Sequence, residues 1–217
     1  MGAPDPARAG AGGGSAAGSD AARDTETIRL WDPLLRVFHW ALAAGVAAAW
    51  LLGRFGPLDM TLHFWAGYVV LGLLAFRVVW GLIGPAPARF ASFLYRPGAV
   101  AAYARGLFRR RPSGWRGHNP LGGVFVVALL VAVGAQAITG LFVDPEDYIN
   151  VGPLAQHVST EAARTALAWH AALAKVVLAL VALHVAAIVF YRLWKREDLV
   201  RPMITGRKAV DRQDPRA

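Results

Sequence analysis

The 217-residue sequence contains no cysteine. This excludes disulfide bonds, thiolate metal sites, iron–sulfur clusters and the covalent attachment of a c-type haem, all of which need cysteine sulfur. Charged residues make up only 17% of the chain, and the acidic ones are the scarcer kind, with 14 Asp and Glu against 23 Lys and Arg. Because the basic residues flank long apolar runs, the net charge of +9 is typical of membrane-facing loops and does not indicate nucleic-acid binding.

Hydrophobic residues, by contrast, make up 56% of the chain, which is too many for a soluble domain of this size. Four apolar runs are long enough to cross a membrane and predict helices at about 36–53, 61–83, 119–143 and 164–193. The predicted fold class is therefore all-α: an integral membrane four-helix bundle that occupies residues 28–208.

Local signals mark the ends of these segments. Asp32 and Pro33 predict the cap and first turn of the first helix, and Gly84 and Pro85 predict the end of the second. Residues 1–27 are rich in Gly, Ala and Ser and predict a disordered tail, with a shorter tail at 209–217. The first tail lacks the apolar core of a signal peptide, so we expect the first membrane helix to direct insertion.

The loops differ in charge. The loop at 85–118 carries seven arginines: Arg89, Arg96, Arg105, Arg109, Arg110, Arg111 and Arg116. The loop after the third helix is acidic instead, and the segment after the fourth helix is basic again. The positive-inside rule therefore places loop 85–118 and both termini in the cytoplasm. Residues 99–108 predict an interfacial amphipathic helix within this loop.

His170 and His184 lie fourteen residues apart in the last apolar run. Fourteen residues turn an α-helix to within about 40° of its starting direction and advance it by about 21 Å. Both imidazoles therefore face one side, near opposite faces of a hydrocarbon layer about 30 Å thick. An unpartnered ionisable ring is costly there, so the pair indicates a functional site. Hydrogen bonding across helices is the structural alternative.

Two further histidines match these two levels. The first helix reaches His39 soon after leaving the cytoplasm, and the second begins with His63 at the outer side, so depth pairs His39 with His184 and His63 with His170. Two imidazoles suit a haem iron whose other ligands come from the porphyrin, whereas zinc usually takes three or four protein ligands. The sequence therefore predicts two non-covalent, b-type haems stacked across the membrane, with these four histidines as iron ligands and one-electron transfer as the chemistry.

Three more residues are candidates for contact with the haems. Arg36 lies one turn before His39, and Arg77 lies fourteen residues after His63, so both could face the propionates of the inner haem. Snorkelling to the interface is the alternative for both arginines. Gly67, one turn after His63, would let a porphyrin edge approach the backbone, although small-residue helix packing would also explain it.

Other polar residues fit this scheme less directly. Lys175 lies within the fourth helix and faces away from His170, so Gln136, a quinone oxygen or a partner subunit are open candidates to pair with it. His118 is interpreted as an interfacial cap of the third helix, and His157 as a solvated residue of the outer loop.

Several motifs in order resemble one family: the bacterial cytochrome b561 proteins together with the cytochrome b subunits of nickel-dependent hydrogenases. The matching pieces, between about Trp31 and Lys208, are Arg36-Val37-Phe38-His39-Trp40, Leu62-His63-Phe64-Trp65-Ala66-Gly67, the segment from Arg77 to Gly84, Gly117-His118-Asn119-Pro120-Leu121-Gly122-Gly123, Thr139-Gly140-Leu141-Phe142, the His170 and His184 pair, and Met203-Ile204-Thr205-Gly206-Arg207-Lys208. The resemblance implies a multi-pass cytochrome of the bacterial inner membrane with two b-type haems. It would exchange electrons of a respiratory chain between the quinone pool and a redox partner, and the four histidines fall on the family's ligand positions.

The expected partners are therefore membrane lipid, quinone or quinol, and a hydrogenase or c-type cytochrome, with a homodimer as a further expectation. No catalytic residue is assigned. Two rival functions are an ion or proton transporter that uses intramembrane His, Lys and Arg, and a membrane anchor in which haem is only structural. A missing Soret band would favour the transporter, and failure of quinol to reduce the protein would favour the anchor.

Overall fold

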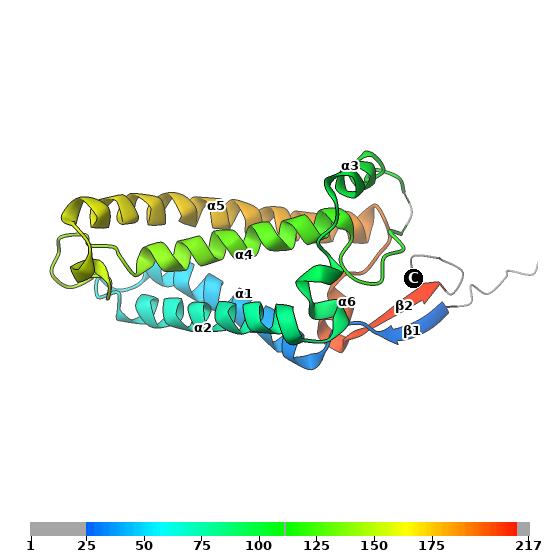
Figure 1. Cartoon of the computed structure of the whole chain (residues 1–217), viewed down its shortest axis with the longest axis horizontal. Helices are drawn as coiled ribbons and strands as arrows, with labels where there is room; N and C mark the ends of the chain where they lie inside the picture. The colour runs from blue at the N-terminus through cyan, green and yellow to red at the C-terminus, as the bar shows by residue number, and fades with distance from the viewer. Residues whose placement is uncertain (1–24, 111, 212–217) are drawn as a thin grey trace, which may run out of the picture.

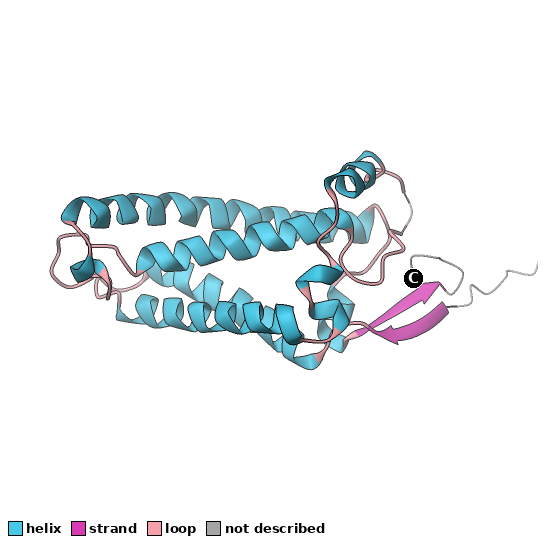
Figure 2. Ribbon diagram, in the orientation of Figure 1, coloured by secondary structure: helices cyan, strands magenta, loops and turns pink. Residues whose placement is uncertain are grey.

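The computed structural model describes residues 25–110 and 112–211. Within them, four long helices form a bundle (Figures 1 and 2): α1 Pro33–Phe55, α2 Thr61–Ile83, α4 Pro120–Gly140 and α5 Thr160–Leu193. In Figure 1, α4 and α5 form one layer, and α1 and α2 form the other. The short elements are β1 Thr25–Arg29, η1 Ala86–Ala88, η2 Phe90–Ser92, α3 Pro97–Arg105, η3 Ala155–His157, α6 Val200–Thr205 and β2 Arg207–Asp211.

The two ends of the bundle are built differently (Figure 1). One end carries β1, β2, α3 and α6, and we call it the strand end. The other end carries the link at 56–60 and the link at 141–159, and we call it the loop end. The basic loop at 85–118 therefore lies at the same end as the described chain ends, and the acidic loop lies at the opposite end.

Helix starts follow the capping residues in the sequence. The Asp32 carboxylate accepts a hydrogen bond from the Leu35 amide at 3.0 Å, with Pro33 as the first helical residue, as the sequence predicts. This cap begins α1 three residues before the predicted start at 36. In the same way, the Ser159 hydroxyl accepts from the Ala162 amide at 3.2 Å, so α5 begins at Thr160 and not at 164.

The predicted end of the third helix at 143 is wrong, because α4 ends at Gly140. The link that follows folds back onto the helix end: the Leu154 amide donates to the Leu141 carbonyl at 2.8 Å, and the Gly152 amide donates to the Val143 carbonyl at 2.7 Å. These bonds take up the carbonyls near the helix end, so the helix does not continue.

The predicted tails at 1–27 and 209–217 are wrong where the structure describes them. β1 and β2 pair antiparallel, with Thr25 opposite Asp211 and Arg29 opposite Arg207. The pairing satisfies backbone amides and carbonyls of both segments, and Val210 is buried beneath it. The remaining predicted tail residues, 1–24 and 212–217, lie outside the described residues.

The helices of the bundle keep apolar side chains on their outer surfaces. Val37, Leu82 and Val131 stay 65–67% exposed, while small clusters such as Val70, Val133 and Val177 fill the interior. All four long helices have the length and composition to cross a membrane. Apolar outer faces on a helical bundle are what a lipid environment requires. The chain is therefore a multi-pass helical membrane protein.

The 85–118 loop contains α3, which begins at Pro97 and ends at Arg105 and thus covers most of the interfacial helix predicted at 99–108. The loop is fastened to the end of α5 by hydroxyl groups. The Tyr103 and Tyr191 hydroxyls are 2.7 Å apart, and the Asn119 side-chain amide donates to Tyr191 at 2.9 Å. These contacts hold the loop against the strand end.

Candidate functional site

The structure brings the four predicted histidines together as two pairs. His39 of α1 and His184 of α5 lie near the strand end, with ring centroids 6.4 Å apart and ring planes 54° apart. His63 of α2 and His170 of α5 lie near the loop end, with centroids 6.1 Å apart and planes 83° apart. These are the pairs that the depth of each residue predicts, while their role as iron ligands stays a prediction.

The spacing within each pair fits one metal ion held between two imidazoles. With metal–nitrogen bonds of about 2.0 Å and ring centres about 1.1 Å beyond the nitrogens, the two centroids would lie about 6 Å apart. Among the described residues, no group of three or more His, Cys, Asp or Glu could hold a metal ion. Two protein ligands are enough to fill both axial positions of a haem iron, because the porphyrin supplies the other four ligands.

At the loop end, backbone carbonyls fix both imidazoles. Nδ1 of His63 lies 2.8 Å from the Ala49 carbonyl of α1, and Nδ1 of His170 lies 2.9 Å from the Gln136 carbonyl of α4. Since a carbonyl oxygen only accepts, each Nδ1 carries the proton and each Nε2 keeps its lone pair. Such bonds orient metal-binding histidines and raise their basicity.

Two glycines make room for the loop-end rings. A Cβ atom at Gly53 of α1 would lie 3.0 Å from the His63 ring, and one at Gly140 of α4 would lie 2.9 Å from the His170 ring. The sequence reasoning missed both as site residues. Gly53 could have been found, because it follows His39 by the same fourteen residues that separate His170 from His184 and therefore shares its helix face.

Gln136 belongs to the loop-end site. Its side-chain nitrogen lies 3.1 Å from Nε2 of His170, and its Oε1 is buried without a partner. The suggestion that Gln136 pairs with Lys175 is therefore wrong, because its amide faces the histidine. Lys175 itself is exposed on α5. Coordination of a metal by Nε2 of His170 would displace the Gln136 amide.

Aromatic rings surround the pair at the strand end. The His184 ring stacks on Phe125 with centroids 6.1 Å apart and planes 5° apart. The His39 ring meets the edge of Trp40 at 5.1 Å, and its Nδ1 is buried without a partner. This pair therefore lacks the carbonyl contact that both loop-end histidines have.

Arg77 is a buried cation at the strand end, with 3% of its surface exposed. Its guanidinium lies over the rings of Phe90 and Phe93, at 4.6 Å and 5.9 Å from their centroids. Asp32 lies within electrostatic range, but Arg77 forms no ion pair with it or with any other described residue. Nη1 of Arg77 has no hydrogen-bond partner.

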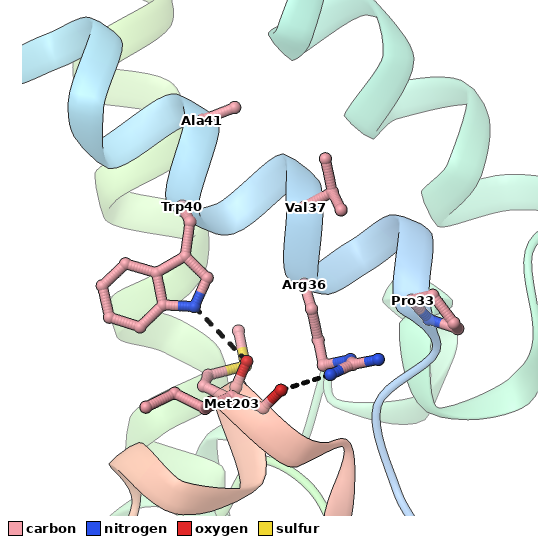
Figure 3. Close-up of a pocket in the computed structure, with 7 residues that line it drawn as sticks. Pro33, Arg36, Val37, Trp40, Ala41 and Met203 are labelled. Atoms are coloured by element: carbon pink, nitrogen blue, oxygen red, sulfur yellow. Dashed lines mark hydrogen bonds between the residues drawn. The ribbon is translucent and has the colours of Figure 1, made fainter.

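Arg36 lies nearby in a different setting. One of its terminal nitrogens donates to the Ile204 carbonyl of α6, while Trp40 donates to the Met203 carbonyl at 3.4 Å (Figure 3). The two contacts line an open, mostly apolar hollow, whose walls are Pro33, Arg36, Val37, Trp40, Ala41, Met203 and Ile204. Nε of Arg36 is buried without a partner, so a propionate contact stays a prediction there too.

Three further residues discussed from the sequence, Gly67, His157 and His118, lie in different surroundings. A Cβ atom at Gly67 would meet nothing within 4 Å, which leaves open space beside α2. His157 is exposed in the loop-end link, as predicted.

His118 is not the cap of α4. Asn119 is the cap, since its side chain accepts a hydrogen bond from the Gly122 amide at 2.8 Å. The His118 ring packs between Trp31 and Phe93 instead, with both centroid distances at 4.9 Å.

Sequence comparison agrees with this geometry. The profile described as prokaryotic cytochrome b561 matches residues 30–206, which include all four long helices and both histidine pairs. The chain belongs to the prokaryotic cytochrome b561 family. A search of curated proteins gave no match.

Membership of the cytochrome b561 family accounts for the pattern of the site. It implies b-type haem in a multi-pass membrane protein that carries electrons. The paired imidazoles, their hydrogen-bonded Nδ1 atoms at the loop end and the buried cation at the strand end all suit such a cofactor.

Proposed function

We propose that this cytochrome b561 carries electrons across the membrane through two b-type haems, one between His39 and His184 and one between His63 and His170. The observation that carries the proposal is the spacing of 6.1 Å and 6.4 Å between the rings of each pair, at opposite ends of the bundle. A haem iron with both axial positions filled supplies one-electron transfer and has no open position for oxygen.

The chain's contribution is to position these ligands. Because α5 supplies one histidine to each pair, it sets the separation of the two sites at about 21 Å along its axis. The carbonyls of Ala49 and Gln136 hold the Nδ1 atoms of the loop-end imidazoles, which leaves each Nε2 as the nitrogen that could bind iron. At the strand end, the Phe125 ring stacks on His184 and the Trp40 ring meets His39 edge-on.

We place the strand end in the cytoplasm, because the arginine-rich loop at 85–118 and the basic segment after α5 both lie there. The membrane would then be the bacterial inner membrane. A reporter fused after Ala217 should be active only on the cytoplasmic side. Activity on the outer side alone would reverse the orientation without affecting the pairing of the histidines.

The proposed electron partners are the quinone pool and a redox protein such as a hydrogenase or a c-type cytochrome. The hollow in Figure 3 supports the quinone assignment, because it is mostly apolar and open, and one of its walls, Trp40, contacts the His39 ring at 5.1 Å. A quinol that reaches this hollow would be close to the strand-end pair. Reduction of the purified protein by quinol would separate this function from that of a structural anchor.

The test of the proposal is the haem content of the purified protein. A pyridine haemochrome assay should give about two haems b per chain, and both should be low-spin in both oxidation states because no axial position is open. One haem per chain, or none, would contradict the two-site arrangement.

A further inference from the structure

Buried polar atoms without partners gather at the strand end. Within the described residues they are Arg36 Nε, His39 Nδ1, Arg77 Nη1, Trp115 Nε1, His118 Nδ1 and Gln136 Oε1. All but the last belong to the strand end. A buried donor without an acceptor costs about 1–3 kcal/mol, and more when it is charged. The strand end therefore has an excess of nitrogen groups that calls for an acceptor from outside the chain.

Two of these groups contact the same aromatic ring. Phe93 is almost fully buried and contacts the Arg77 guanidinium at 5.9 Å and the His118 ring at 4.9 Å. The Trp31 ring also contacts the His118 ring, with centroids 4.9 Å apart. Both nitrogens are thus held by rigid aromatic contacts, which provide no hydrogen-bond acceptor for either.

The backbone around His118 is also fixed. The Tyr95 hydroxyl donates to the His118 carbonyl at 3.0 Å, and the next residue, Asn119, caps α4. Pro120, the first residue of α4, is fully buried. The ring is therefore preorganised in a place from which it also reaches the electrostatic range of His39 and His184.

Charge at this place is unbalanced. Burial first, and then the positive charge of Arg77, lower the pKa of His118 to about 4, so the imidazole is neutral at pH 7 and Arg77 carries the charge. Asp32 acts on Arg77 only from a distance and makes no ion pair with it. A carboxylate that entered between the two residues would supply both the missing charge and the missing acceptor.

We propose that Arg77 and His118 together bind one propionate of the strand-end haem, with Arg77 donating from Nη1 and His118 from Nδ1. This rests on the proposed function, since the propionate belongs to the haem held by His39 and His184. It gives His118 a binding role in place of the capping role that the sequence indicates. Neither donor would contact the iron, so any effect on its midpoint potential would act through the carboxylate.

The experiment compares three variants after wild type is shown to bind two haems b. His118→Phe keeps the aromatic packing and removes the donor, His118→Gln keeps an N–H donor, and His157→Phe repeats the first change at an exposed position. The haem is labelled with ¹³C at its propionate carboxyl carbons. Redox-difference infrared spectroscopy then reports these carboxylates directly, and redox titration reports each haem.

In His118→Phe, we expect the labelled carboxylate band of one haem to shift, and its midpoint potential to fall by up to about 59 mV, which is tenfold in the one-electron equilibrium. The fall follows because an unneutralised carboxylate favours ferric iron. His118→Gln should recover most of both effects, and His157→Phe should show neither. Combined with Arg77→Gln, the two changes should be less than additive, because both act on one carboxylate.

Unchanged carboxylate bands in a His118→Phe protein that holds two haems would overturn the inference and leave the proposed function intact. Loss of folded protein in both His118→Phe and His118→Gln would show a structural role alone and would overturn it as well. A wild-type protein without two haems contradicts the proposed function itself, before any variant is made.

Discussion

The strand end and the loop end hold equivalent histidine pairs in different surroundings. At the loop end, carbonyls of α1 and α4 bind Nδ1 of His63 and His170. At the strand end, Nδ1 of His39 has no partner, and the buried Arg77 lies nearby. A hydrogen bond from Nδ1 raises the basicity of the imidazole, whereas a cation stabilises the more electron-rich ferrous state. The carbonyl contacts at the loop end would therefore lower the midpoint potential of a haem bound there, whereas the cation at the strand end would raise the midpoint potential of a haem bound at that end.

The largest effect is expected from removing one histidine at a time, first at the strand end and then at the loop end. His184→Ala should remove the strand-end haem or convert it to high spin, because five-coordinate iron and a cavity remain. The other haem, about 21 Å away along α5, should keep both ligands and its spectrum. His170→Ala should do the reverse. Haem content and electron paramagnetic resonance of the oxidised protein measure both changes.

The opposing ligands provide the control for this experiment. His39→Ala should reproduce the spectrum of His184→Ala, and His63→Ala should reproduce that of His170→Ala. If His184→Ala resembled His63→Ala in redox titration, the ligands would cross between the two ends and the comparison would fail.

A smaller effect is expected from two glycines that lie against the loop-end rings; no described glycine lies against the His39 or His184 ring in this way. Gly140→Ala would place a Cβ atom 2.9 Å from the His170 ring, and Gly53→Ala would place one 3.0 Å from the His63 ring. A ring coordinated to iron cannot yield freely, so the loop-end haem should be partly lost or partly high-spin. The strand-end spectrum should not change. Equal losses at both ends would show that the substitutions act on the whole bundle.

Gly67→Ala tests whether a porphyrin edge lies beside α2, as the sequence predicts. A Cβ atom at Gly67 meets nothing within 4 Å, and the same is true at Gly72 of the same helix. If a porphyrin fills the space beside Gly67, Gly67→Ala should weaken haem retention at the loop end and Gly72→Ala should not. Haem content after dilution or competition with apomyoglobin measures retention. Identical behaviour of the two variants would assign Gly67 to helix packing alone.

The sequence predicted the histidine pairs but not what surrounds them. His170 and His184 share one helix, so their spacing fixes their relative direction, and the depth of the spans pairs them with His63 and His39. Gly140 and the Gln136 carbonyl contact His170 from another helix, so the distance between helices decides their role. Capping rules located Asp32, but they misassigned His118, whose environment is made by Trp31 and Phe93 far along the chain.

The two terminal strands were missed for a similar reason. β1 and β2 have five residues each and are almost 180 residues apart, and their register is Thr25 to Asp211 through Arg29 to Arg207. Five residues are too few to give a clear periodic signal, and a short strand is stable only once its partner is in place. Long apolar helices, by contrast, are determined by local composition, so α2 was predicted at the bounds it has.

The different surroundings of the two pairs also predict which haem has the higher midpoint potential. The cation at the strand end and the carbonyl contacts at the loop end both predict a higher potential for the strand-end haem. In His170→Ala, the remaining low-spin haem should therefore titrate at the higher of the two wild-type potentials. Arg77→Gln should lower that potential by about 60 mV, a tenfold change in the one-electron equilibrium. If the haem that remains in His170→Ala had the lower potential, the assignment of the ends would be reversed.

The smallest effect concerns the ion pairs of the two ends. Glu197, with 8% of its side chain exposed, accepts from Lys208 at 2.9 Å and from the Ser113 amide and hydroxyl at 2.8 Å and 3.0 Å. Burial raises the pKa of Glu197, but Lys208 and Ser113 more than offset this, so the pKa lies below its usual 4.5. A carboxylate with a depressed pKa stabilises the fold above pH 4.5 and loses this contribution as the pH falls through its folded pKa.

Glu197→Gln removes the charge that pairs with Lys208 and keeps only one of the two acceptor oxygens, so one Ser113 donor also loses its partner. The change should cost about 1–3 kcal/mol of stability at pH 7. The difference from wild type should shrink below pH 4.5, where the wild-type carboxylate becomes protonated. Glu146→Gln is the matched change at the loop end, where Glu146 and Arg164 form an exposed pair at 2.7 Å. Solvent screens that pair, so its loss should leave the melting temperature unchanged. Thermal unfolding in detergent at pH 7 and pH 4 measures both variants, and equal shifts would show that the strand end gains nothing from burying its pair.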